Sequence, residues 1–96
     1  MKYKDLARTF EIFASKDPNN IVMDWAEHDE WGIDLHYTSI ELSPSEVREL
    51  AEMGWGLGSD NEYDENTMKA WKKPSEHTDE ELMELWNEYK SIYKYA

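Results

Sequence analysis

Four oxygen-bearing side chains recur at every second position in one polar stretch of the chain, a spacing that suits metal binding. They are Asp60, Glu62, Asp64 and Asn66. Alternating carboxylate and amide oxygens open the calcium loop of an EF-hand, which also needs glycine at its sixth position and a bidentate glutamate at its twelfth. Glu65 and Trp71 stand at those two positions instead. The stretch 60–66 therefore predicts a solvated acidic loop, with a metal site as the alternative.

His28 is the second candidate for chemistry, because carboxylates surround it. Glu27, Asp29 and Glu30 are its near neighbours, and nearby carboxylates stabilise an imidazolium and raise its pKa, as suits a general base. Consecutive residues of a strand or tight turn point in different directions, however, so they do not converge on one ion. We expect a surface histidine in a turn, and a metal site here is again the alternative.

Signatures of nucleophilic and phosphate chemistry are missing from the sequence. Cysteine is absent, no Gly-x-Ser-x-Gly segment occurs, and Ser43 is accounted for as a helix cap. The glycine-rich segment 54–58 lacks the Gly-Lys-Ser/Thr ending of a phosphate-binding loop. We therefore expect a protein that is not an enzyme and uses no cofactor.

Negative charge dominates the composition. The 96 residues include 22 Asp and Glu against 10 Lys and Arg, which gives a formal net charge of -12. Such a charge repels nucleic acid and anionic membrane surfaces, and it favours partners with a basic surface. No apolar run approaches the roughly 20 residues of a membrane span. The composition thus predicts a cytoplasmic protein that binds neither nucleic acid nor membrane directly.

Hydrophobic spacing predicts the elements of the first half of the chain. Helical spacing of apolar residues predicts a first helix roughly between Lys4 and Lys16, with an apolar face made of Tyr3, Leu6, Ala7, Phe10, Phe13 and Ala14. Period-two alternation over residues 21–26 and 31–37 predicts two strands joined as an antiparallel hairpin. The segment Ser43-Pro44-Ser45-Glu46 is a capping box that starts a second helix, and Gly54 is placed to end it.

The second half is expected to repeat this arrangement. Residues 55–58 and 67–71 predict a second hairpin around the acidic loop, and the capping box at Thr78 to Glu81 starts a last helix whose apolar stripe extends to Tyr93. Hydrophobic residues make up 40% of the chain, enough for one core. We predict a single α+β domain over residues 1–96, in the order α-β-β-α-β-β-α, with antiparallel hairpins packed against helices.

The carboxylates fall into three acidic zones. The first hairpin carries Asp24, Glu27, Asp29, Glu30 and Asp34, the second loop carries Asp60, Glu62, Asp64 and Glu65, and the last helix region carries Glu76, Asp79, Glu80, Glu81, Glu84 and Glu88. If both hairpins share one sheet, their loops form an extended negative surface that fits a groove lined by Arg and Lys. The nine residues of the first two zones are the predicted partner-binding site. Three unrelated solvated faces are the alternative.

One segment resembles a known class of proteins. The stretch LSPSEVRELAEMGW from Leu42 to Trp55, followed by an acidic loop and Trp71, is similar to the layout of small orphan proteins of bacteriophage genomes, and it covers about a third of the chain. Phage orphans of this size and charge include inhibitors of host enzymes and of CRISPR effectors, some of them nucleic-acid mimics. The resemblance by itself implies no fold and no activity, but it favours an interaction protein. Together with the acidic charge and the missing catalytic signature, it leads us to expect a phage-type, anti-CRISPR-like inhibitor that docks its acidic surface on a basic, nucleic-acid-binding site of a host protein such as a CRISPR effector.

Two other function classes stay open at this point. One is a metal-binding protein that uses the loop 60–66 or the cluster at His28. The other is a structural or assembly protein, in which exposed Trp or Tyr side chains form a homo-oligomer interface. A monomer and a homodimer are both compatible with the sequence.

Overall fold

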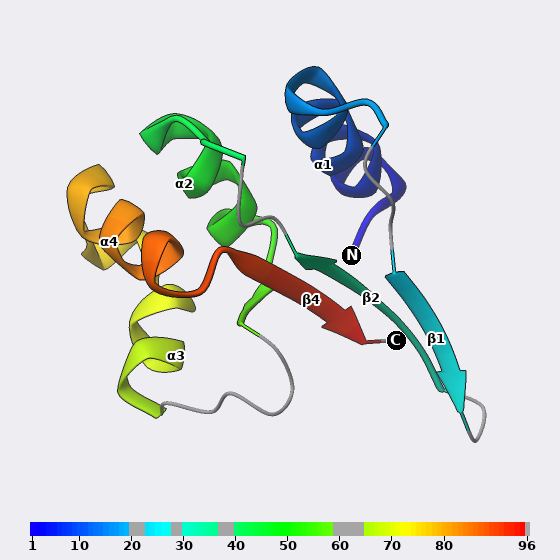
Figure 1. Cartoon of the computed structure of the whole chain (residues 1–96). Helices are drawn as coiled ribbons and strands as arrows, with labels where there is room; N and C mark the ends of the chain where they lie inside the picture. Colours follow the sequence, from blue (N-terminus) through cyan, green and yellow to red (C-terminus); the bar gives the residue numbers. More distant parts are fainter. Residues whose placement is uncertain (20–22, 28–29, 37–39, 59–64, 96) are drawn as a thin grey trace.

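The computed structural model describes residues 1–19, 23–27, 30–36, 40–58 and 65–95. Within these ranges the chain is an α+β protein (Figure 1). Its elements are α1 (Tyr3–Lys16), β1 (Met23–Glu27), β2 (Glu30–His36), α2 (Pro44–Glu52), β3 (Gly56–Leu57), α3 (Glu65–Trp71), the 3-10 helix η1 (Pro74–Glu76), α4 (Asp79–Tyr89) and β4 (Ser91–Tyr95).

All four strands belong to one antiparallel sheet, in the order β1-β2-β4-β3. The hairpin predicted from period-two alternation is confirmed, because β1 pairs with β2 and places Trp25 opposite Gly32. Ile92 of β4 lies opposite Leu35 on one side and Leu57 on the other. The last strand of the chain therefore occupies an inner position between strands from much earlier in the sequence.

The second predicted hairpin is wrong. Among the described residues of this segment, only Gly56–Leu57 forms a strand, which pairs with β4, whereas residues 65–71 form helix α3. Thr67, Met68 and Trp71 are the buried residues of this helix. Met68 and Trp71 follow Thr67 by one and four residues, a spacing that matches one face of a helix and not the alternation of a strand.

The last helix is also shorter than predicted. It ends at Tyr89, and Lys90 adopts a left-handed conformation with φ of 48° before the chain enters β4. Helical spacing through Ile92 and Tyr93 suggested a longer helix. Ile92 is instead part of the sheet, where it is fully buried. In the described residues the predicted order of elements is therefore replaced by α-β-β-α-β-α-α-β, with η1 between the last two helices.

Three tryptophans dominate the described core. Trp55, Trp71 and Trp86 are each at most 1% exposed, and Leu50, Leu57, Leu82 and Ile92 are buried with them. Figure 1 shows α2, α3 and α4 grouped together, with the hairpin of β1 and β2 extending away from them. Because large aromatic side chains fill this core, it needs no disulfide or metal to reach a useful size.

Helix α1 is oriented differently from the sequence expectation. Its buried residues are Thr9, Ile12 and Phe13, whereas Tyr3, Ala7, Phe10 and Ala14 of the predicted apolar face are exposed. The buried side of α1 is partly polar, because Thr9 accepts a hydrogen bond from Trp55 Nε1 at 3.0 Å. No described helix has the length and apolar character that crossing a lipid bilayer requires.

Candidate functional site: an acidic stripe on α4

The start of α4 is fixed by the predicted capping box. Glu81 N–H donates to Thr78 Oγ1 at 3.1 Å, and Thr78 N–H donates to a Glu81 carboxylate oxygen at 2.9 Å. The Thr78 backbone hydrogen bond, with the neighbouring His77, holds the pKa of Glu81 below its ordinary value. Two of the otherwise unsatisfied N–H groups at this helix terminus are thereby satisfied.

Arg48 of α2 joins that helix to the start of α4. Its Nη1 donates to the Pro74 carbonyl at 2.9 Å and its Nη2 donates to the His77 carbonyl at 2.7 Å. Its Nε donates to the Asp79 carboxylate in the first turn of α4. One guanidinium therefore satisfies two carbonyls of the η1 segment and one carboxylate, which fixes α4 relative to α2.

Glu80, Glu84 and Glu88 form what we call the α4 acidic stripe. All three are exposed, and residues four apart lie on the same face of a helix. Among the described residues, none forms an ion pair with these three carboxylates. On the buried side of α4, Leu82 and Trp86 are 0% exposed. The helix thus presents a row of negative charge outward while its other side anchors it in the core.

This stripe is only partly explained by the stability of the helix, because Glu80 lies in the first turn, where the helix dipole favours a negative charge, whereas Glu84 and Glu88 lie beyond it. Like charges four residues apart destabilise a helix by about 0.2 to 0.5 kcal/mol per pair. Glu88 lies in the last turn, where the helix dipole disfavours a negative charge, and α4 has no basic residue in its last turn. A positively charged partner surface would convert this unfavourable arrangement into a favourable one.

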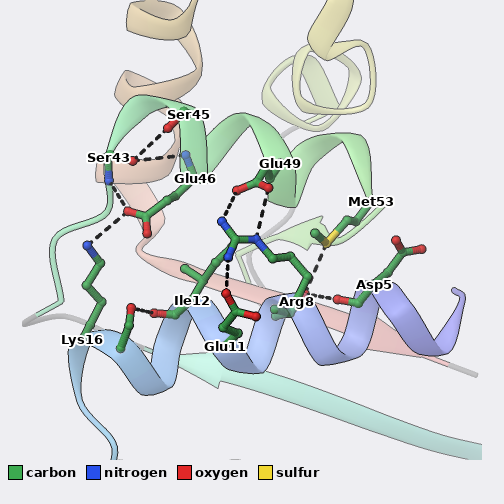
Figure 2. Close-up of polar contacts among 12 residues, drawn as sticks. Asp5, Arg8, Glu11, Ile12, Lys16, Ser43, Ser45, Glu46, Glu49 and Met53 are labelled. Carbon is green, nitrogen blue, oxygen red and sulfur yellow. Dashed lines mark hydrogen bonds and ion pairs between the residues drawn. The ribbon is translucent and has the colours of Figure 1, made fainter.

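A second acidic site lies between α1 and α2, but its charge is partly neutralised. A cleft of about 310 Å³ is lined by Asp5, Glu49, Glu52 and Met53. Figure 2 shows Arg8 bound through two nitrogens to Glu49, at 3.1 and 2.9 Å, and through the third to Glu11 at 2.7 Å. Hydrogen bonding to Glu49 raises the pKa of Arg8. Because Glu49 already holds a cation, this cleft is a weaker candidate for a basic partner.

The residues predicted as the partner-binding site do not form one described surface. The backbone of Asp24, Glu27, Glu30 and Asp34 lies on β1 and β2, with Glu27 opposite Glu30 at the end of the hairpin. Glu65 is exposed at the start of α3 and pairs with Lys69 at 3.1 Å. Figure 1 shows the hairpin end and α3 far apart. Asp29, Asp60, Glu62 and Asp64 lie outside the described residues.

The metal-binding alternative stays a prediction. In the described ranges no three His, Asp or Glu side chains gather as metal ligands, but His28 and most of the loop 60–66 fall outside them. His77 Nδ1 lies 3.4 Å from Glu81 Oε2, and this contact is explained by the cap of α4.

The α4 acidic stripe was visible in the sequence as part of the third acidic zone, although the first two zones were preferred. Its signal was the strict spacing of four residues within a capped helix. No protein-family model, no curated protein and no solved structure matches this chain. Function is therefore inferred from the charges and contacts of the described residues.

Glu46 predicts a specific pH dependence of stability. Burial alone would raise the pKa of this carboxyl, but the Ser43 backbone N–H at 2.8 Å and the Lys16 ammonium at 3.2 Å outweigh burial and lower it (Figure 2). A carboxylate with a lowered folded-state pKa stabilises the fold above its unfolded-state pKa of about 4.3, and this stability is lost as pH falls through the folded-state value.

The substitution Glu46→Gln tests this effect, because glutamine still completes a capping box but cannot titrate. We expect the variant to be less stable than wild type by about 0.5 to 1 kcal/mol at pH 7 and equally stable near pH 3. Urea unfolding at several pH values measures the difference. A gap that is the same at pH 7 and pH 3 would contradict the assignment.

Proposed function

We propose that this protein is a non-enzymatic binding module of the phage-inhibitor type, which docks an acidic surface on a basic, nucleic-acid-binding site of a host protein such as a CRISPR effector. The α4 acidic stripe carries this proposal. Its three carboxylates are exposed, aligned and without ion pairs among the described residues, on a helix held firmly by its cap and by Arg48.

The geometry of the stripe suits a row of basic side chains. Residues four apart in a helix rise by about 6 Å, so Glu80 and Glu88 are about 12 Å apart along the axis. Arginine side chains bind carboxylates through two parallel hydrogen bonds, and they also line the grooves that hold phosphate backbones. The carboxylates of this row therefore carry the negative charge that a nucleic-acid-binding groove attracts.

The preformed conformation of α4 supports the same reading. The Arg48 contacts and the buried Trp86 hold the helix before any partner arrives. Binding then orders only the glutamate side chains, which keeps the entropic cost of association low. The net charge of -12 further accelerates encounter with a basic partner at low ionic strength.

Salt and competition test the proposed function. The immobilised chain is used to retain partners from bacterial lysate, and the affinity of each purified partner is then measured between 50 and 500 mM NaCl, with and without its nucleic acid. We expect affinity to fall steeply with salt and nucleic acid to compete. Binding that is insensitive to salt and unaffected by nucleic acid would overturn the proposal.

Neutralising the stripe should weaken this binding. The triple variant Glu80→Gln, Glu84→Gln, Glu88→Gln is expected to lose about 10- to 100-fold in affinity, because each removed contact is worth about 0.5 to 1 kcal/mol. The measurement is a fluorescence-anisotropy titration at 100 mM NaCl. Circular dichroism checks that α4 remains helical.

Two further variants, one of them matched to the triple variant in net charge, assign the loss to a surface. Glu41, Glu52 and Glu76 are exposed elsewhere, and changing all three to Gln alters the net charge equally. We expect the affinity of this control to lie within about threefold of the wild-type affinity. A loss as large as that of the stripe variant would show that binding depends on net charge alone. The hairpin is tested by a variant in which Asp24, Glu27, Glu30 and Asp34 are changed to the corresponding amides. If only this variant loses affinity, the docking surface is the hairpin and not the α4 acidic stripe.

A further inference from the structure

Helix α1 presents an apolar stripe that the rest of the described chain leaves uncovered. Its members are Tyr3, Ala7, Phe10 and Ala14, which we call the α1 outer stripe, and all four are exposed. Tyr3 is 92% exposed and Phe10 is 37% exposed. Their separations of four, three and four residues are those of a coiled-coil seam. The opposite side of the helix, with Thr9 and Ile12, is buried.

We propose that the α1 outer stripe is a self-association surface, on which α1 of two copies of this chain pair in antiparallel orientation. The stripe is self-complementary in this orientation. Tyr3 meets Ala14 of the partner subunit, and Phe10 meets Ala7 of the partner subunit, so every layer combines one large and one small side chain. In a parallel pair, Tyr3 would meet its own copy and the alanines would leave gaps, which is poor packing.

Charge supports a second copy as the occupant. Lys4 and Glu11, seven residues apart, lie along one flank of the stripe, and the antiparallel pair brings Lys4 near the partner's Glu11 on both halves of the contact. Glu11 also binds Arg8 of its own chain at 2.7 Å, so its carboxylate would be shared between the two cations. Residues 1–17 hold four Lys or Arg against three Asp or Glu, whereas the remaining residues hold six against nineteen. The α1 region is therefore close to neutral, so two copies of this acidic chain that meet there avoid most of the repulsion between them.

The size of the contact sets its strength. Fourteen residues span about 21 Å of helix, so two such helices bury less than the 1,200 Å² or more of a typical stable interface. We expect a dissociation constant on the order of 100 µM. Salt should strengthen this dimer, because screening reduces the repulsion between two copies that each carry a charge of -12.

Sedimentation equilibrium from 10 µM to 1 mM protein tests the pairing. The apparent mass is expected to rise from 11.4 kDa toward twice that value, more strongly at 500 than at 50 mM NaCl. The variant Phe10→Glu should stay monomeric, and Asn87→Glu, which adds the same charge on exposed α4, should dimerise as wild type does. A monomeric wild type at 1 mM, or equal behaviour of the two variants, would overturn the proposal.

Cysteine cross-linking tests the orientation, since the natural chain has no cysteine. In the antiparallel pair the two copies of position 7 lie about 4.5 Å apart along the axis, whereas the two copies of position 14 lie about 16 Å apart. Ala7→Cys should form a disulfide-linked dimer at least tenfold faster than Ala14→Cys. Equal rates would overturn the antiparallel pair. This inference is independent of the proposed function, because it leaves the α4 acidic stripe free.

Discussion

Replacing Trp55 with phenylalanine is expected to lower the free energy of unfolding by about 2 to 4 kcal/mol, the largest effect we expect from a single substitution here. Trp55 is 1% exposed, so the smaller ring leaves a cavity that the packed neighbours fill only in part. The substitution also removes the indole N–H that donates to Thr9 Oγ1 at 3.0 Å. Urea unfolding followed by far-UV circular dichroism measures the loss.

The position of Trp55 in a hydrogen-bonded chain explains why the effect is large. Trp71 Nε1 donates to the Trp55 carbonyl at 2.7 Å, and Thr9 Oγ1 in turn donates to the Asp5 carbonyl at 2.8 Å. Trp55 therefore links α3 to α1. Trp55→Phe keeps the backbone carbonyl that accepts from Trp71, but it takes the indole donor away from the buried Thr9 Oγ1, and a buried polar group that loses its partner costs about 1 to 3 kcal/mol.

Changes at Thr9 separate hydrogen bonding from packing at this position. Thr9→Val keeps the volume of the side chain and removes the acceptor for Trp55, whereas Thr9→Ser keeps the acceptor and removes a methyl group. If Trp55→Phe unfolds within about 0.5 kcal/mol of wild type, Trp55 is not the link that we describe.

The second large effect is expected at Gly56. A Cβ at this position would lie 2.4 to 2.7 Å from ring atoms of Tyr93, which is its cross-strand partner in β4. Because such a contact is far inside the van der Waals limit, Gly56→Ala must displace the Tyr93 ring or separate β3 from β4. We expect a loss of about 1 to 3 kcal/mol in the free energy of unfolding.

A double-mutant cycle isolates the cause of this loss. When Tyr93 is first changed to Ala, the obstacle is gone, and Gly56→Ala should then be nearly neutral, since alanine restricts the unfolded chain more than glycine does. Thermal unfolding of the four proteins gives the coupling energy. An equal cost of Gly56→Ala in both backgrounds would show that the backbone, and not the Tyr93 ring, requires glycine.

The two proposed surfaces are expected to respond oppositely to ionic strength. Docking of the α4 acidic stripe on a basic groove weakens as salt screens the attraction, whereas pairing through the α1 outer stripe strengthens as salt screens the repulsion between acidic copies. The surfaces also lie on different helices, so a dimer would display two acidic stripes. Multivalent binding to a partner with two basic sites would follow.

Local signals in the sequence were reliable. Ser43 and Thr78 start their helices with the expected reciprocal bonds to Glu46 and Glu81, and Gly54 has the positive φ of 91° that was expected after α2. The alternation of residues 23–36 produced the first hairpin. Each of these features is decided by side chains within one turn or by one periodic pattern, so no distant partner is needed to predict it.

Features that depend on distant partners were not predictable in the same way. Ile92 and Tyr93 continue the apolar stripe of α4 at helical spacing, although residues 91–95 form strand β4. Backbone pairing with β2 and β3, which lie on either side of β4 in the sheet, selects the strand. For residues 65–71 the acidic loop before them suggested a hairpin, whereas burial of Met68 and Trp71 on one side selects a helix.

The sequence by itself determined the acidic character of this protein, its α+β class, the capped starts of α2 and α4 and the spacing of the glutamates on α4. Only the tertiary structure decided which charges are free and which apolar residues are covered. Arg48 and Arg8 bind Asp79 and Glu49 across helices, and α1 turns Thr9 inward and Phe10 outward. The physical reason is that ion pairing and burial depend on residues far apart in the chain, whereas helix caps and charge depend on neighbours alone.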